Sequence, residues 1–158
     1  MDLLVQKAVE LGVRVIQPLV TERTVVRLED KEAEKKREKW QRVALEACKQ
    51  CGQNTLPEVR EPVAFSELEH GNSDGTMRLM ASLAEGARAF RELLSAEGDR
   101  PGRVEILIGP EGDFSPGETQ AALDAGFQPV TLGQIVLRVE TAALFCLSAL
   151  RFWYDEGR

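Results

Sequence analysis

The sequence predicts an α/β fold, with a mostly parallel sheet flanked by helices. Apolar runs of strand length alternate with helical patterns along the whole chain, and VEILI at residues 104–108 is typical of a buried parallel strand. Such alternation favours parallel strands joined by helices that cover the sheet. At 158 residues the chain fits one domain with a substantial core.

The first half of the chain predicts two helices around a strand. Apolar residues recur at helical spacing over 3–11, Gly12 is a natural stop, and residues 13–20 predict a strand that ends near Pro18. Residues 30–51 predict a long helix, with mixed charge facing solvent at first and a buried stripe from Trp40 onward. Weaker patterns predict a strand over 58–63, a short helix near residue 66, a strand over 77–82 and a helix over 85–94.

A clearer pattern follows the VEILI strand, which leads directly into GPEGDFSPGE. Ser115, Pro116 and Glu118 predict a helix start, because Ser is a good N-cap, Pro suits the first helical position, and Glu three residues after the cap completes a capping box. This helix should end near Gly126. A strand over 128–131, the loop LGQIVLR and an apolar helix over 140–154 complete the prediction.

Composition excludes several classes of protein. No apolar run approaches the roughly 18 residues of a membrane span, and the N-terminus lacks the features of a secretory signal, so we expect a cytoplasmic protein that does not contact membranes. Three cysteines, an odd number, favour reduced thiols. A net charge of -6 means that contact with nucleic acid needs a local patch, a further domain or a partner subunit.

Two glycine-bearing loops, GPEGD and LGQIVLR, follow predicted strands and should line one pocket at the carboxyl edge of the sheet. Gly109 and Gly112 would let the backbone approach a ligand, although a tight turn without a ligand explains their spacing equally well. The chain has no P-loop and no G-x-G-x-x-G fingerprint. Because Glu111 and Asp113 would repel a phosphate, a cationic or neutral ligand, such as a sulfonium compound, fits the loop better.

Four stretches together resemble the motifs of the RsmE family, ribosomal RNA small subunit methyltransferase E of the SPOUT superfamily. They are LLVQKAVELGV, WQRVALEACKQCGQNTLPEV, LIGPEGDFSPGE and LGQIVLRVETAALFCLSAL, which occur in the family's order and cover nearly the whole chain. The resemblance implies a deep trefoil knot near the C-terminal end of the sheet, a homodimer, and S-adenosylmethionine (SAM) as cofactor. It also implies methyl transfer to N3 of a uridine in the 16S RNA of the small subunit.

The resemblance also implies a set of site residues. The cofactor loops would comprise Gly109, Pro110, Glu111, Gly112, Leu132, Gly133, Leu137, Arg138 and Thr141, with Ala81 and Ser82 as a third wall. The family usually has glycine at the position of Asp113, arginine at that of Ile135 and threonine at that of Val139. Family members also carry an N-terminal RNA-binding barrel resembling a PUA domain, and this chain begins where the second domain normally begins.

Methylation at N3 of uracil requires removal of the N3 proton or stabilisation of the anion that develops. Arg138 is the candidate for stabilising the uracil oxygens, and Glu140 for orienting Arg138 or accepting the proton. The simpler interpretation of both is a helix start with an acid in its first turn. Candidate RNA contacts are Arg23, Gln50, Gln53 and Asn54, whose side chains could equally serve loop and cap hydrogen bonds.

The remaining features of note have structural explanations. Cys48 and Cys51 form a C-x-x-C without a second pair, and the only histidine, His70, lies in a separate polar segment, so no metal site is predicted. A stripe on the last helix, of Ala142, Phe145, Cys146, Ala149 and Leu150, belongs either to the core or to a dimer contact.

Two other functions remain open at this stage. A SPOUT methyltransferase acting on transfer RNA or on a ribose hydroxyl would bind the same cofactor. A domain that binds RNA or a small ligand without catalysis would differ in class. A hydrolase fits poorly because the chain has no G-x-S-x-G elbow.

Overall fold

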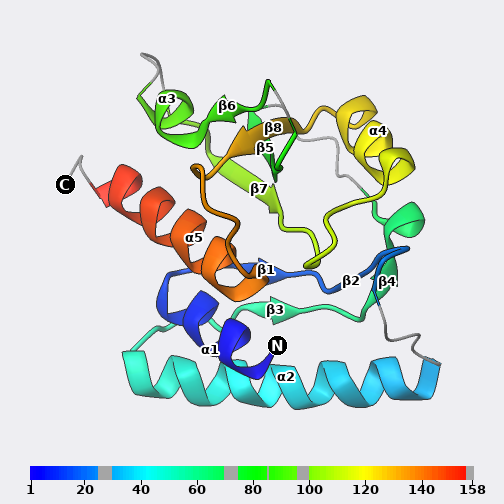
Figure 1. The fold of residues 1–158 in the computed structure, drawn as a ribbon. Coiled ribbons are helices and arrows are strands. Elements are labelled where there is room, and N and C mark those ends of the chain that lie inside the picture. The colour runs from blue at the N-terminus through cyan, green and yellow to red at the C-terminus, as the bar shows by residue number, and fades with distance from the viewer. Residues whose placement is uncertain (25–29, 70–74, 85, 96–99, 156–158) are drawn as a thin grey trace.

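The computed structural model describes residues 1–24, 30–69, 75–84, 86–95 and 100–155. Its centre is a four-stranded parallel sheet in the order β6-β8-β5-β7, and two small parallel sheets pair β1 with β3 and β2 with β4 (Figure 1). The large sheet consists of β5 (Thr76–Ala81), β6 (Arg88–Ala89), β7 (Arg103–Leu107) and β8 (Gln128–Thr131). The predicted α/β class with mostly parallel strands is therefore confirmed.

β5 is buried because it lies between two other strands of the sheet, β8 and β7. Leu79 and Met80 are 0% and 1% exposed. On one side Leu79 pairs with Ile106 of β7, and on the other Met80 pairs with Pro129 of β8. Because the strands are parallel, the loops that follow β5, β7 and β8 leave the sheet at the same edge.

The chain passes from β7 to β8 through α4 (Pro116–Asp124), whose start has the predicted capping box. The Ser115 hydroxyl accepts the Glu118 N–H at 3.3 Å, and the Glu118 carboxylate accepts the Ser115 N–H at 2.8 Å. The capping box therefore determines where the helix begins, and it orients the GPEGD loop that precedes the helix.

The N-terminal half forms a layer of two helices against the small sheets. These elements are α1 (Asp2–Glu10), β1 (Val15–Ile16), β2 (Leu19–Val20), α2 (Asp30–Cys51), β3 (Glu58–Val59), β4 (Val63–Ala64) and the 3-10 turn η1 (Phe65–Glu67). The strand predicted over residues 13–20 ends near Pro18 as expected, since β1 stops at Ile16, but Leu19–Val20 forms a separate strand, β2, that was not predicted. Pro18 between them has no N–H to donate, and the Gln17 amide donates to the carbonyls of Pro18 and Glu61 across the break.

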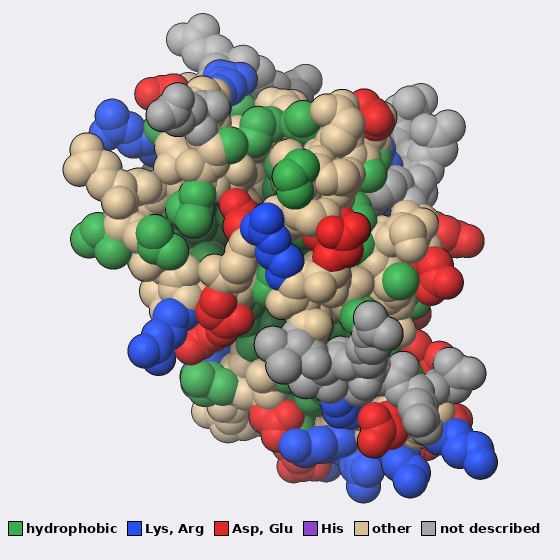
Figure 2. Space-filling view, turned by 45° about the vertical axis from the view of Figure 1, so that its right-hand side comes forward, with side chains coloured by type: hydrophobic (Ala, Val, Ile, Leu, Met, Phe, Trp, Pro, Cys, Tyr) green, Lys and Arg blue, Asp and Glu red, His purple; other side chains and the backbone are tan. Residues whose placement is uncertain are grey.

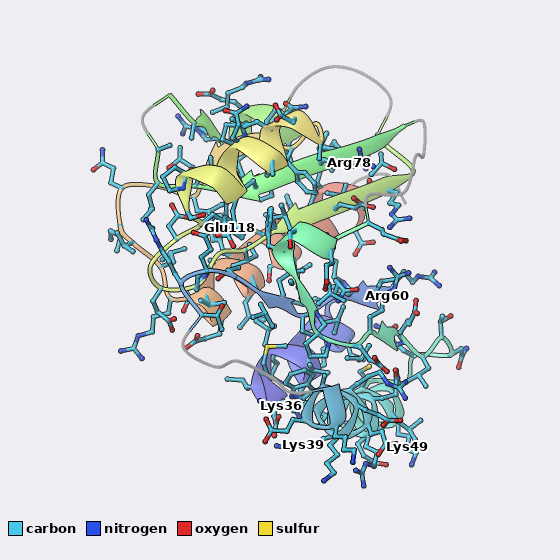
Figure 3. All side chains as sticks on the ribbon, turned by 90° about the vertical axis from the view of Figure 1, so that its right-hand side faces the viewer. Lys36, Lys39, Lys49, Arg60, Arg78 and Glu118 are labelled. Carbon is cyan, nitrogen blue, oxygen red and sulfur yellow. The ribbon has the colours of Figure 1, made fainter. Side chains whose placement is uncertain are left out.

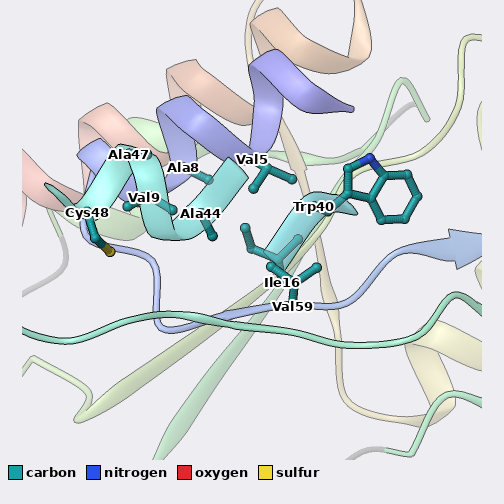
Figure 4. Packing of buried hydrophobic residues seen from close by; sticks show 9 residues of the cluster. All are labelled: Val5, Ala8, Val9, Ile16, Trp40, Ala44, Ala47, Cys48 and Val59. Atoms are coloured by element: carbon teal, nitrogen blue, oxygen red, sulfur yellow. The ribbon is translucent and has the colours of Figure 1, made fainter. Parts of the chain in front are cut away.

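A compact apolar cluster joins α1 and α2 to the first small sheet (Figure 4). Val5 and Val9 of α1 and Ala44 of α2 are 0% exposed. Trp40 is 8% exposed, and its indole N–H donates to Asp2 at 3.1 Å, so the ring is buried while its polar edge is satisfied. The predicted buried stripe of α2 thus packs as expected.

The last helix, α5 (Val139–Asp155), covers the large sheet together with α3 (Phe90–Leu94). The helix predicted over residues 85–94 is wrong in its first part. Arg88–Ala89 is strand β6, paired with β8, and Gly86 has a φ of +87° that no α-helix contains. Glu85 lies outside the described residues. Among the helices described, none is long and apolar enough to cross a membrane.

The three cysteines are free thiols in different surroundings, which predicts different reactivities. Cys51 is exposed, whereas Cys48 and Cys146 are buried, and burial raises the pKa of Cys146 to about 12. Because the thiolate is the nucleophile, Ellman's reagent at pH 8 should modify Cys51 rapidly and Cys146 only on unfolding. Modification of Cys146 at the rate of Cys51 would contradict the packing of α5 on the sheet.

Candidate cofactor site

A pocket opens at the carboxyl edge of the sheet, where three strand-end loops and the start of α5 meet. It is lined by Ala81, Ser82, Leu83, Ile108, Gly109, Pro110, Glu111, Asp113, Leu132, Gly133, Ile135, Val136, Leu137, Val139 and Ala142. The structure thus brings together most of the residues predicted to hold the cofactor. The exceptions are Gly112, Arg138 and Thr141, which do not line the pocket.

The loop after β7 makes a tight turn that presents backbone to the pocket. The Asp113 N–H donates to the Pro110 carbonyl at 2.9 Å. A side chain on Gly109 would crowd the wall of the turn, because a Cβ there would lie 3.3 Å from the Phe114 ring and 3.1 Å from an Asp113 carboxylate oxygen. A larger residue at 109 would therefore need the Phe114 ring and the Asp113 carboxylate to shift by a few tenths of an ångström.

The charge of the pocket is negative. Glu111 and Asp113 line it, and no lysine or arginine does. Within the described part of the chain, neither carboxylate has an ion-pair partner. The other lining residues are mostly apolar, so the site disfavours phosphate and suits a cationic or neutral ligand with apolar surface.

The loop after β8 forms the outer wall of the pocket. Gly133 has a φ of +128°, and its N–H donates to the Thr131 hydroxyl at 3.3 Å. Ile135 and Val136 beyond it are 78% and 68% exposed. The pocket holds about 70 Å³, whereas small-molecule sites usually have about 300 Å³ or more. Entry of a nucleoside-sized ligand must therefore move this loop outward.

The two predicted catalytic residues stand beside the pocket at the start of α5. The Arg138 carbonyl accepts the Ala142 N–H at 2.8 Å, as expected at a helix start, and its side chain is exposed. Glu140 is half-buried in the first turn. No hydrogen bond or ion pair between described residues joins Arg138 to Glu140, so the structure shows no orienting contact between them.

Two contacts from the N-terminal half hold the GPEGD loop in place. The Arg23 guanidinium donates to the Gly112 carbonyl. The Glu118 carboxylate accepts the Glu22 N–H at 2.9 Å with one oxygen, while the other accepts the Ser115 N–H. Glu118 is 7% exposed and lies at the start of α4 (Figure 3). The buried carboxylate therefore links the pocket loop to the segment after β2.

The four predicted RNA contacts do not form one surface. Arg23 follows β2 near one end of α2, whereas Gln50, Gln53 and Asn54 lie at the other end of this 22-residue helix (Figure 1). The Gln53 amide donates to the Val9 carbonyl, and Arg23 contacts Gly112, so both side chains have structural partners. Gln50 and Asn54 are exposed.

A second hollow is a surface groove between α1 and α2. It is wider, about 630 Å³, and is lined by Gln6, Lys39, Arg42, Val43, Glu46, Ala47 and Gln50. No strand-end loop reaches it, and Lys39 pairs with Asp2 at 2.6 Å. Figure 2 shows Lys and Arg mixed with Asp and Glu along the lower edge, where α2 lies. The smaller strand-end pocket is therefore the better candidate site.

No group of three His, Cys, Asp or Glu side chains among the described residues could hold a metal ion. Cys48 Sγ donates to the Thr55 carbonyl at 3.7 Å, which gives this thiol a structural partner. His70 lies outside the described residues.

The residues predicted individually for the cofactor omit several that line the pocket: Leu83, Ile108, Asp113, Ile135, Val136, Val139 and Ala142. Asp113, Ile135 and Val136 lie within GPEGD and LGQIVLR, the two loops that were predicted to line one pocket. The other missed residues flank predicted ones, so extending each predicted loop by one or a few residues would have included them.

The fold and the pocket define an α/β protein with a hollow at the carboxyl edge of a parallel sheet, where proteins of this class hold their ligands. A family model described as an RNA methyltransferase domain matches residues 1–151. The chain belongs to this family.

Individual relatives agree with the family match. The chain is 34% identical over 144 residues to ribosomal RNA small subunit methyltransferase E of Mesomycoplasma hyopneumoniae, covering 91% of this chain and 60% of that protein. Against the Bacillus subtilis protein of the same name, identity is 33%, over 96% of this chain and 60% of the relative. The resemblance to RsmE is thus confirmed, and the chain spans about three fifths of the length of these relatives.

Solved structures agree as well. Ribosomal RNA small subunit methyltransferase E from Neisseria gonorrhoeae, bound to SAM, superposes with a TM-score of 0.83 and 36% identity, over 96% of this chain and 60% of that one. A putative methyltransferase from Legionella pneumophila, also with bound SAM, gives a TM-score of 0.82 and 36% identity, with the same coverage.

Proposed function

We propose that residues 1–158 form one SAM-dependent methyltransferase domain that methylates N3 of a uridine in 16S ribosomal RNA. The observation that carries this proposal is the pocket, which combines apolar walls, two carboxylates and no cation at a strand-end edge. SAM has an overall positive charge and a large apolar purine, so it matches these walls. SAM-bound relatives of the same fold support the choice of cofactor.

The loops of the pocket would hold the cofactor mainly through backbone groups. Glycine at 109 leaves the loop backbone open, and Leu132, Gly133 and Leu137 come from the opposite loop. When bound, SAM supplies an electrophilic methyl group. The polypeptide would have to exclude water from that group and present the RNA base to it.

Arg138 and Glu140 are proposed to act on the uracil ring. The exposed guanidinium of Arg138 can stabilise negative charge on the uracil oxygens as the N3 proton leaves, and the Glu140 carboxylate can accept that proton. Their neighbours Leu137, Val139 and Ala142 line the pocket, which supports a role for the pair beside the methyl donor.

A homodimer is proposed through the outer face of α5. Of the predicted stripe, Ala142, Cys146 and Leu150 are buried within the subunit, whereas Phe145 is 47% exposed. Phe152 on the same helix is 68% exposed. Such an exposed apolar face is typical of a subunit contact.

We also propose that the chain has the family's trefoil knot near the C-terminal end of the sheet. The protein is further proposed to lie in the cytoplasm, where ribosomal RNA is modified.

The test is product analysis. The chain, alone and fused to the N-terminal region of the Bacillus subtilis relative, is incubated with labelled SAM and, in separate reactions, small subunits that lack the modification and unmodified transfer RNA. Nucleosides are then separated by mass spectrometry. We expect N3-methyluridine. A ribose-methylated nucleoside, or methylation of transfer RNA only, would assign a different substrate, and SAM binding without any product would favour a non-catalytic domain.

A further inference from the structure

Asp113 departs from its family's pattern and has a constrained geometry. Its φ is +60°, which makes it the one non-glycine residue with positive φ in the described part of the chain. Aspartate tolerates this left-handed conformation better than most residues, but glycine adopts it freely. A residue kept in such a conformation is a candidate for function.

The carboxylate of Asp113 is held in place rather than free in solvent. One oxygen accepts the N–H of Phe114 at 2.8 Å. The same oxygen lies 3.1 Å from the point where a Cβ on Gly109 would stand, so it leans back over the loop. The side chain is half-buried and lines the pocket, whereas that of Glu111 is exposed.

The two carboxylates of the pocket therefore differ in the cations they favour. An ammonium group is strongly hydrated and suits an exposed acid such as Glu111. A sulfonium carries its charge among carbon substituents and holds water weakly, so it suits a half-buried acid in a pocket with apolar lining residues such as Ile108 and Leu132. Of the charged groups of SAM, only the sulfonium is lost when the methyl group leaves.

We propose that Asp113 is a specificity-determining residue that recognises the sulfonium and lets this chain distinguish SAM from its product, S-adenosylhomocysteine (SAH). This rests on the proposed function, since it assumes that SAM occupies the pocket. The negative charge would stabilise the charged substrate and not the neutral thioether, so SAM would compete with bound product more effectively than at a loop with glycine in this position.

The test is calorimetric titration of the chain with SAM and, separately, SAH. The wild-type chain should bind SAM at least about tenfold more tightly than SAH, which corresponds to about 1.4 kcal/mol. Asp113→Asn keeps an oxygen that can accept the Phe114 N–H and tolerates positive φ, but removes the charge. It should weaken SAM binding about tenfold and leave SAH binding nearly unchanged, so that the two affinities converge. Asp113→Gly should give the same convergence.

Glu111→Gln is the matched control, since it removes a carboxylate from the same loop. It should weaken SAM and SAH by the same factor, because both ligands keep the ammonium group. A SAM preference that survives in Asp113→Asn, or that falls equally in Glu111→Gln, would overturn the proposal. If neither ligand binds the wild-type chain, the proposed function itself fails. If both bind with equal affinity, only the role of Asp113 fails.

Discussion

Arg138→Ala should lower the rate of methyl transfer at saturating SAM by about 100-fold or more, the usual cost of removing one group that stabilises a developing anion. The guanidinium is exposed beside the pocket and has no hydrogen bond to another described residue, so its removal should leave the melting temperature unchanged. SAM affinity should fall much less than the rate, because the proposed cofactor contacts are mainly to backbone groups. Single-turnover transfer of a labelled methyl group to small subunits measures the effect.

Arg138→Lys distinguishes charge from geometry. Lysine keeps the positive charge but lacks the planar pair of donors that can span two oxygens, so its rate should lie between those of the wild type and the alanine variant. A rate for Arg138→Ala within threefold of the wild type would show that Arg138 is only the residue before a helix. The simpler interpretation of this position would then hold.

Glu118→Ala should be strongly destabilising, because the buried carboxylate accepts two backbone N–H groups from separate parts of the chain. Removing it leaves the N–H groups of Glu22 and Ser115 without this acceptor and breaks the capping box of α4. We expect the free energy of unfolding to fall by about 3 kcal/mol and the melting temperature by roughly 6–12 °C. Thermal and urea unfolding monitored by circular dichroism measure both quantities.

Glu46→Ala is the control for this variant. Glu46 is also a helical glutamate, but it is exposed and its ion pair with Lys49 is a surface pair, so its loss should change stability by less than about 0.5 kcal/mol. Glu118→Gln should be intermediate, since the amide oxygen can accept one of the two N–H groups while the amide nitrogen faces the other. Equal stabilities of Glu118→Ala and Glu46→Ala would contradict the linking role of Glu118.

Local patterns in the sequence predicted the parts of the fold that local physics determines. The strand at residues 128–131 and the capped start of α4 agree with the structure because alternating burial and cap chemistry act within a few residues. The second strand after Pro18, β2, and the short edge strand β6 were missed, since both depend on pairing with distant segments, β4 in one case and β8 in the other.

The candidate site was predictable only to the level of its loops. That GPEGD and LGQIVLR meet follows from parallel strands, and the structure brings them together. The contacts that hold these loops did not follow, because Glu22 and Glu118 are 96 residues apart and no pattern relates them. Arg23 was predicted to contact RNA, but its described contact is the Gly112 carbonyl, which the sequence could not indicate.

Calorimetric titration of this chain with SAM and, separately, with ATP tests most directly whether the strand-end pocket binds SAM. We predict saturable binding of SAM and none of ATP, because Glu111 and Asp113 would repel the triphosphate and no cation lines the pocket. Binding of ATP alone, or of neither compound, would contradict the assignment of this pocket as a cofactor site.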